Sequence, residues 1–207
     1  HLKSYTMANA YFTPPVAVNE PVLGYAPGSA EKEELQAVYA EMKGKTIDAP
    51  MYIGDKLVTT DNKVSMHPPH DHQHLLGHFN MGTGAHVTQA IDAALAARDK
   101  WASTPWQDRA AIFLKAAALL EGPFRARMNA STMLCQSKNA MQAEIDAACE
   151  LIDFFKFNVQ YMTDVYSGQP ESGDGVWNRL EYRPLEGFVF AVTPFNFTSI
   201  CANLCAA

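Results

Sequence analysis

Residues 185–200 constrain the fold more than any other part of the chain, and they read Leu-Glu-Gly-Phe-Val-Phe-Ala-Val-Thr-Pro-Phe-Asn-Phe-Thr-Ser-Ile. The apolar run 188–192 predicts a short strand, a Thr-Pro pair breaks it, and a second apolar segment follows. Strand, turn and helix in this order are typical of an open α/β sheet, which binds ligands at the carboxyl ends of its strands. We therefore predict an α/β fold with a ligand site near this turn.

The turn carries one side chain that packing does not explain. Asn196 stands between Phe195 and Phe197, and its amide group needs partners for two N–H donors and one carbonyl. The residues alone leave two interpretations open. Asn196 either caps the helix expected to begin near Ser199, or it donates a hydrogen bond to a ligand.

The same stretch resembles the Pro-aromatic-Asn-Phe motif of the aldehyde dehydrogenase superfamily. Thr198 follows the motif where most of the superfamily has Pro, which is typical of the 1-pyrroline-5-carboxylate (glutamate semialdehyde) dehydrogenases of mitochondrial proline catabolism. Other segments resemble this branch in the right order, so that the resemblance runs from about residue 19 to the end, with weak patches near 60–80 and 168–178. These segments are 19–23, 90–98, 108–117 and 142–158.

The resemblance implies NAD-dependent oxidation of L-glutamate 5-semialdehyde, a small-molecule aldehyde, to glutamate. It also implies roles for individual side chains: Asn196 as the oxyanion donor; Thr193, Pro194 and Phe195 as cofactor-binding residues beside NAD; Glu150 and Phe197 as substrate-binding residues. The plainer alternatives are a strand-to-helix turn at 193–195, a core position for Phe197, and an exposed Glu150 paired with a Lys or Arg.

The resemblance further implies that the chain is the N-terminal part of an aldehyde dehydrogenase fold. The expected regions are an extended arm (1–30), the helical part of the NAD-binding domain (31–166), a strand of the oligomerisation flap (167–186), and the first strand and turn of an incomplete Rossmann-like core (187–207). The family's nucleophilic Cys, general-base Glu and ribose-binding Lys would then lie beyond the chain, so we expect its 207 residues alone to be inactive. The alternative is a truncated, non-catalytic homologue that acts as a structural or interaction subunit.

Apolar spacing predicts the local elements between the arm and the turn. Helices are expected at 31–43, from 84 onward with an apolar stripe ending near Trp101, from Thr104 to 122, at 126–137 and at 142–166. In the third of these, Thr104 is expected to be the cap and Pro105 the first helical residue. Strands are expected at 51–58, with a turn at Gly54, and at 176–183.

Charge and composition narrow the partners. The net charge of −6 argues against binding to nucleic acid, and no apolar run is long enough to span a bilayer. Four prolines within residues 1–30 predict an extended strap over a partner surface. No acidic residue precedes Glu20, which fits a cleaved targeting segment, and the resemblance implies the mitochondrial matrix and a homodimer or higher homo-oligomer.

Histidines and cysteines are the remaining candidates for chemistry. The histidines cluster in a Pro-rich stretch, and zinc is conceivable there, but we expect no metal, because the stretch is predicted to be a loop and the family uses none. They are His67, His70, His72, His74 and His78. We expect the cysteines to be free thiols and none to be the nucleophile; these are Cys135, Cys149, Cys201 and Cys205.

Overall fold

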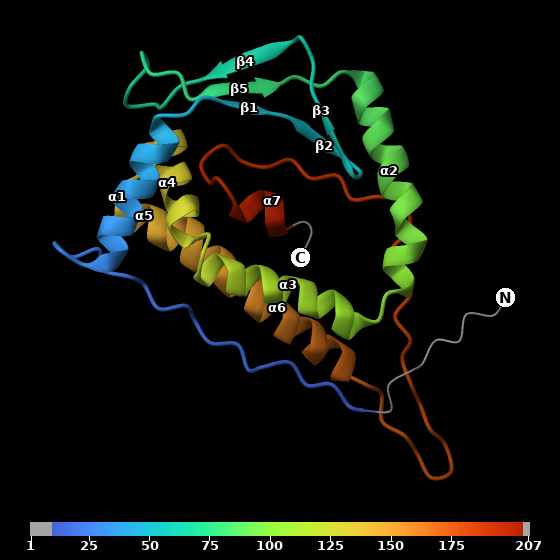
Figure 1. The fold of residues 1–207 in the computed structure, drawn as a ribbon. Coiled ribbons are helices and arrows are strands. Elements are labelled where there is room, and N and C mark those ends of the chain that lie inside the picture. The colour runs from blue at the N-terminus through green and yellow to red at the C-terminus, as the bar shows by residue number, and fades with distance from the viewer. Residues whose placement is uncertain (1–9, 205–207) are drawn as a thin grey trace.

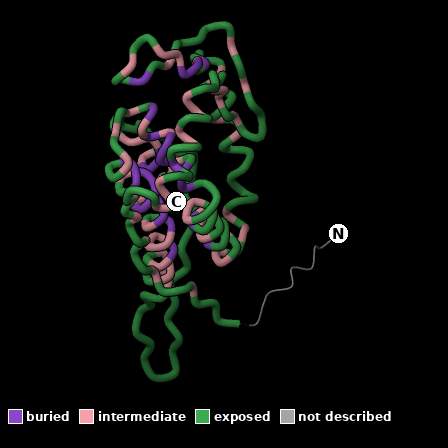
Figure 2. The backbone as a smooth tube through the Cα atoms, turned by 60° about the vertical axis from the view of Figure 1, so that its left-hand side comes forward, coloured by how far each residue is buried: buried purple, intermediate pink, exposed green. Residues whose placement is uncertain are grey.

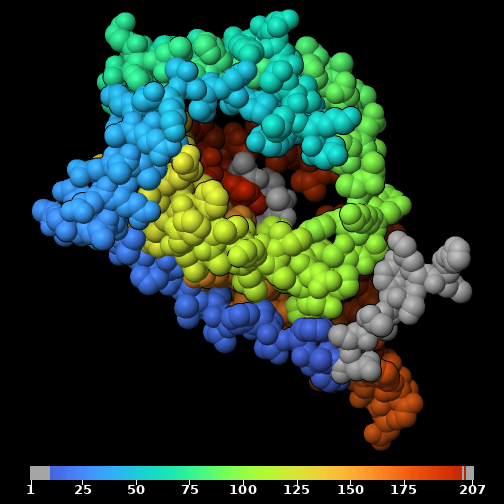
Figure 3. Space-filling model, in the orientation of Figure 1, coloured from blue at the N-terminus to red at the C-terminus, as the bar shows by residue number. Residues whose placement is uncertain are grey.

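The computed structural model describes residues 10–204 and arranges its elements around a ring (Figures 1 and 3). Strands form the top, α2 (Gly84–Ser103) runs down one side, α3 (Trp106–Glu121) and α6 (Glu150–Ser167) form the base, and α1 (Ala30–Lys43) and α4 (Arg125–Gln136) close the other side. The C-terminal segment, with the short helix α7 (Ile200–Leu204), lies inside the ring. The mixture of helices and sheets agrees with the predicted α/β class.

The hydrophobic core lies on the helical side of the ring, where Figure 2 shows most of the buried residues. Helix α3 packs along α6, and α1 packs along α4. Ile200 of α7 belongs to the same core as residues of α3 and α6, and Phe197 packs against it. This anchorage holds the end of the C-terminal segment against the helices. The core members are Ala117, Ala148, Leu151, Ile152, Phe155 and Ile200.

Two small sheets form the top of the ring. In the first, β5 (Gly77–Asn80) lies between β1 (Ile47–Ala49), which is parallel to it, and β4 (Lys63–Met66), which is antiparallel. We did not predict these three strands. The loop expected for the histidine stretch is present between β4 and β5, at residues 67–76, although His78 lies in β5. Gly77 has a φ of 143°, and a Cβ there would lie 2.0 Å from the carbonyl oxygen of Ile47, so only glycine permits this pairing.

The second sheet confirms the predicted strand pair near residues 51–58. Strands β2 (Met51–Ile53) and β3 (Lys56–Val58) form an antiparallel hairpin, and Gly54 makes the turn with a φ of 62°. The positive φ explains why glycine stands at this position.

The predicted helices are present, with two local corrections. Pro105 precedes α3 in an extended conformation, and the Thr104 hydroxyl donates to the Lys100 carbonyl at 2.8 Å, so Thr104 closes α2 and does not cap α3. The predicted apolar stripe of α2 is also largely exposed: no residue of this helix is buried, and Val87 and Trp101 face solvent. Among the described elements, α2 packs chiefly against β2.

The long helix predicted at 142–166 has three parts. Helix α5 (Ala140–Ala143) leads into a π-helical turn, η1 (Glu144–Cys149), and then into α6. A π-helical turn has no simple sequence signature, and such turns are frequent at functional sites. Here the turn contains Glu144 and Asp146, which contact two different parts of the molecule.

Neither of the other predicted strands forms within the described residues. The segments 176–183 and 188–192 are extended but have no strand partner, and most of their apolar side chains are exposed, including Trp177, Phe190 and Val192. An alternating or apolar run becomes a strand only when a neighbouring strand supplies hydrogen-bond partners. No helix in the described range combines the length and the apolar character that crossing a membrane requires.

The arm is extended, as predicted, and it lies along helices of its own chain. Its expected role as a strap over a partner surface stays a prediction. The backbone N–H of Ala17 donates to Gln160 of α6 at 2.8 Å, and that of Glu20 donates to Asp153 at 2.6 Å. Figure 1 shows the arm running beneath the base of the ring. The first nine residues of the predicted arm, and Cys205, lie outside the described residues.

Candidate functional site

The Asn196 turn (residues 193–199) carries most of the predicted site residues. Thr193, Pro194, Phe195 and Asn196 are all exposed, and Phe195 is 97% exposed. Burial then increases along the chain, because Phe197 and Thr198 are partly buried while Ser199 and Ile200 are buried. The turn is therefore fixed at its carboxyl end and open to solvent at Asn196.

The position of Asn196 disfavours the capping interpretation. Helix α7 begins at Ile200, and the residue before it is Ser199, whose carbonyl oxygen accepts from Asn203 N–H at 3.3 Å. Asn196 lies three residues further back and is exposed. Within residues 10–204, no hydrogen bond involves its side chain. The amide is thus placed where it can donate to a ligand.

Helix α4 and the residues just after it hold the backbone of this turn through three side chains, which we call the α4 cradle: Thr132, Gln136 and Lys138. The Gln136 amide donates to the Phe195 carbonyl at 3.2 Å, and the Lys138 ammonium donates to the Asn196 carbonyl at 2.9 Å. Thr132 and Thr198 share a hydroxyl–hydroxyl hydrogen bond of 2.5 Å. Each cradle residue therefore contacts a different residue of the turn.

Thr132 and Gln136 are four residues apart on α4, which places them on one face of the helix. Lys138 follows the end of that helix, where Ser137 adopts a left-handed conformation with a φ of 57°. The reversal at Ser137 turns the chain so that residue 138 also approaches the turn. Sequence reasoning missed all three cradle residues, because their partners are about 60 residues away along the chain.

Lys138 makes further contacts that link the turn to η1. Its ammonium group lies 2.7 Å from a carboxylate oxygen of Asp146 and 4.4 Å from the centre of the Phe197 ring. Both charged side chains are largely buried, with 18% of Lys138 and 29% of Asp146 exposed. A charge over an aromatic face and a shielded ion pair are each stabilising, and together they restrict Phe197.

Glu150, predicted on the substrate side, is a partly buried residue at the start of α6. Burial and the nearby charge of Asp146 raise the pKa of its carboxyl group, and the charge of Lys138 opposes this. No ion pair joins Glu150 to a Lys or Arg in the described part of the chain, so the alternative of a paired surface Glu is not supported. The electrostatic coupling places Glu150 in the same neighbourhood as Lys138 and Asp146.

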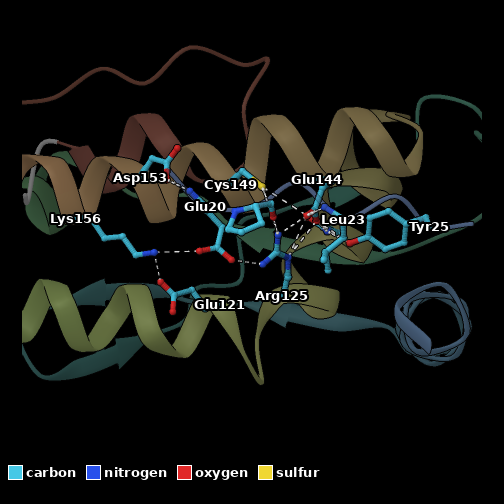
Figure 4. A network of polar contacts seen from close by, with 11 residues as sticks. Glu20, Leu23, Tyr25, Glu121, Arg125, Glu144, Cys149, Asp153 and Lys156 are labelled. Atoms are coloured by element: carbon cyan, nitrogen blue, oxygen red, sulfur yellow. Dashed lines mark hydrogen bonds and ion pairs between the residues drawn. The ribbon is translucent and has the colours of Figure 1, made fainter. Parts of the chain in front are cut away.

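A second polar cluster, the arm network, joins the arm to the helices (Figure 4). Arg125 bonds both Glu144 and Glu20, the latter at 2.5 Å, and Lys156 bonds Glu20 at 3.0 Å and also Glu121. These side chains are mostly buried, and Glu144 is completely so. Glu20 lies in the segment 19–23, which belongs to the family resemblance, but no local signal in the sequence indicates its ion pairs.

Titration of the arm network follows from its pairing. Burial alone would raise the pKa of Glu144, but hydrogen bonds from Arg125, the Leu23 N–H, Tyr25 and Asn129 outweigh it and lower the pKa to about 2. Burial and the neighbouring carboxylate raise the pKa of the Cys149 thiol to about 12. The network is therefore charged and fixed near neutral pH, and Cys149 is a neutral thiol without nucleophilic character.

The histidines do not form a metal centre within the described residues. His67 and His74 each bond a backbone carbonyl, and His70 bonds the Ser137 hydroxyl at 2.7 Å. These histidines thus support the loop before β5. Cys135 is exposed as a residue, but partial desolvation of its sulfur still raises the pKa of the thiol, which the hydrogen bond with Ser131 opposes.

Comparisons with known proteins identify the family that this chain resembles. The model of the aldehyde dehydrogenase family matches residues 57–207. A delta-1-pyrroline-5-carboxylate dehydrogenase from Agaricus bisporus is 52% identical over 193 residues, which cover 92% of this chain and 35% of the relative. The mitochondrial enzyme of that name from Homo sapiens is 46% identical over 189 residues, covering 91% of this chain and 34% of the relative.

A solved structure agrees with the family match and with the two relatives. The delta-pyrroline-5-carboxylate dehydrogenase from Mycobacterium tuberculosis, crystallised with NAD, has a TM-score of 0.93 and 47% sequence identity, over 95% of this chain and 37% of that one. The chain spans about a third of the length of the curated relatives it matches.

Proposed function

Because this chain belongs to the aldehyde dehydrogenase family, we propose that it forms part of an NAD-dependent enzyme that oxidises L-glutamate 5-semialdehyde, the open form of 1-pyrroline-5-carboxylate, to glutamate. Support comes from the relatives of that name in Agaricus bisporus and Homo sapiens and from the NAD-bound neighbour. The observation that carries the proposal is the exposed Asn196 amide on a turn whose backbone is held by three side chains.

In this proposal Asn196 stabilises the oxyanion. When a thiolate adds to the aldehyde carbon, the carbonyl oxygen becomes an alkoxide, and the Asn196 N–H donates to it. A donor that is already in place favours the transition state over the ground state by about 3 kcal/mol. The Cys135 and Cys149 thiols both have raised pKa values, which disfavours either of them as the source of this thiolate.

The remaining predicted residues fit a cofactor and a substrate on the two sides of Asn196. Thr193, Pro194 and Phe195 present a hydroxyl group, exposed backbone and an exposed ring, which suit contact with a dinucleotide. NAD, when bound, supplies the hydride acceptor. On the other side, the Phe197 ring packs on the aliphatic part of the semialdehyde, and Glu150 borders the same space from α6.

We also propose the setting in which this enzyme works. Several relatives carry the word mitochondrial in their names, which supports a mitochondrial location, and we extend the proposal to the matrix. The exposed segment 176–192, which pairs with no strand within the described residues, supports a homo-oligomer in which an edge of the chain pairs with another copy. The alternative of a non-catalytic subunit gains no support from the structure, because the Asn196 turn is well anchored.

The proposal is tested by replacing Asn196 in the complete protein. We expect Asn196→Ala to lower kcat for NAD-dependent oxidation of glutamate 5-semialdehyde at least tenfold, because an oxyanion donor acts only in the transition state. Asn62→Ala, at an exposed turn between β3 and β4, is the matched control and should keep the wild-type rate. An unchanged rate in Asn196→Ala would remove the oxyanion assignment. Failure of the wild type to reduce NAD with this aldehyde would overturn the function itself.

A further inference from the structure

The contact that most directly fixes Asn196 comes from Lys138. Its ammonium group donates to the backbone carbonyl of Asn196 at 2.9 Å, while the Asn196 side chain remains exposed. The lysine therefore holds the backbone of the same residue whose side chain presents the amide. A hydrogen bond from a charged donor is roughly twice as strong as a neutral one, so it is well suited to this purpose.

Lys138 is itself held in place from two other directions. Asp146 of η1 binds its ammonium at 2.7 Å, and the Phe197 ring lies beneath it with its centre 4.4 Å from the nitrogen. A lysine side chain normally samples many rotamers, but here carboxylate, carbonyl and ring together select one position. The Asn196 carbonyl is thus attached to the core through Asp146 and not to a mobile surface group.

The other two residues of the α4 cradle hold the turn on either side of Asn196. Gln136 holds the carbonyl before Asn196, and Thr132 holds Thr198 two residues after it. With Lys138 in the middle, three successive anchors surround Asn196, whose own side chain makes no hydrogen bond within residues 10–204. Removing the central anchor leaves the ends fixed while the peptide at 196 becomes free to rotate.

We propose that Lys138 is a positioning residue for the Asn196 oxyanion donor, acting through the Asn196 carbonyl and stabilised by Asp146. This inference rests on the proposed function, since an oxyanion donor has meaning only for that reaction. Lys138 does not contact the reacting atoms. Its effect appears in the transition state, because that is where the aim of the Asn196 amide matters.

The test compares Lys138→Met with Lys138→Arg in the complete protein. Lys138→Met keeps much of the length of the side chain but removes the charge and the donors, and we expect kcat to fall about tenfold with KM changed less than twofold, as for loss of a transition-state interaction. Lys138→Arg keeps the charge and should recover at least a third of the wild-type kcat. The matched control is Lys45→Met, which removes an exposed lysine paired with Glu41 and should leave kcat unchanged.

A double-mutant cycle separates positioning from general support of the fold. If Lys138 acts through Asn196, Lys138→Met should lower kcat less than twofold when Asn196 is already Ala, because no donor remains to be aimed. Multiplicative losses in the double variant would overturn the inference, and so would a wild-type kcat in Lys138→Met. Should Lys138→Met fail to fold, Lys138→Gln, which keeps a donor without the charge, is measured in the same cycle.

Hydrogen exchange supplies a readout that does not depend on activity. In the complete protein without substrate, the amides of residues 195–199 should exchange faster in Lys138→Met than in the wild type, while those of α3 stay unchanged. Unchanged exchange at 195–199 would overturn the inference even where the enzyme is active. If the wild type shows no oxidation of the semialdehyde, the proposed function fails together with the oxyanion role of Lys138, whereas an active wild type with an unaffected Lys138→Met removes the inference alone.

Discussion

The arm network and the Asn196 turn are both held by charged side chains, but they use them in opposite ways. In the arm network, each charged side chain bonds one of opposite charge, and Arg125 lies between Glu20 and Glu144. In the turn, one charge, Lys138, holds a backbone carbonyl so that a neutral side chain can stay unbonded and exposed. The first region uses its polar groups to join segments, and the second uses them to keep one group available.

This difference has an energetic meaning. A buried ion pair contributes little when it is compared with apolar packing, but removing one member leaves the other charged and unpaired, which is costly. The Asn196 turn depends on fewer buried charges. Removing one of its contacts should therefore change kcat more than the free energy of unfolding. The two regions are joined through η1, because Glu144 enters the arm network and Asp146 binds Lys138.

The largest expected effect comes from breaking the arm network at its centre. Arg125→Met would leave Glu144 and Glu20 without their main partner, and we expect a loss of about 3–5 kcal/mol in the free energy of unfolding. Chemical denaturation of the complete protein measures this. Arg98→Met, which removes an exposed pair with Asp99, is the control and should change stability by less than about 0.5 kcal/mol. A loss below about 1 kcal/mol in Arg125→Met would show that Glu144 and Glu20 do not depend on Arg125 to offset the cost of burying their charges.

A change of pH tests the same network without a change at Arg125. The pKa of Glu144 is about 2 in the folded chain, below its ordinary value of 4.5, so folding is favoured by the charged form. This contribution is complete above pH 4.5 and is lost as the pH falls through 4.5 toward 2; by linkage it amounts to about 3 kcal/mol.

The measurement is the unfolding free energy of the wild type and of Glu144→Gln between pH 7 and pH 3. The variant should be less stable at pH 7, and its stability should fall less steeply with acid, because the group that takes up the proton is gone. Parallel curves for the two proteins would contradict the assignment of a depressed pKa to Glu144.

The two regions also differ in how far the sequence predicted them. The motif around Asn196 has local signals, so its turn, its exposed amide and the helix after it could be expected from adjacent residues. The strand before it could not be confirmed, because 188–192 has no strand partner in the described part of the chain. A strand depends on its neighbours, whereas a helix such as α1 satisfies its own backbone and was predicted nearly to the residue.

The arm network and the α4 cradle were not predicted, for a related reason. Their contacts join residues far apart in the sequence: Arg125 meets Glu20 across 105 positions, and Thr132 meets Thr198 across 66. An Arg at the start of a helix or a Lys after a helix end is compatible with many partners. The identity of the partner is fixed only by packing. The π-helical turn, which directs Glu144 and Asp146 to different regions, makes these partners still harder to predict from the sequence.

The smallest expected effect is at Thr132, and it tests whether the turn can be loosened without damage to the fold. The Thr132 hydroxyl donates to the Met128 carbonyl at 3.0 Å, so its single proton is used and Thr198 must donate in the bond between the two hydroxyls. Thr132→Val keeps the shape but leaves the Thr198 donor without this acceptor, which should cost about 1–2 kcal/mol in the free energy of unfolding.

Thr132→Ser retains the acceptor and is the matched control for this change. We expect it to keep the exchange rate of the Thr198 amide, while Thr132→Val raises that rate and lowers kcat by less than Lys138→Met does, because Thr132 anchors the end of the turn and not Asn196 itself. Hydrogen exchange and steady-state kinetics on the three proteins give this order. A kcat loss in Thr132→Val equal to that in Lys138→Met would mean that the turn moves as one unit and that its central anchor has no special role.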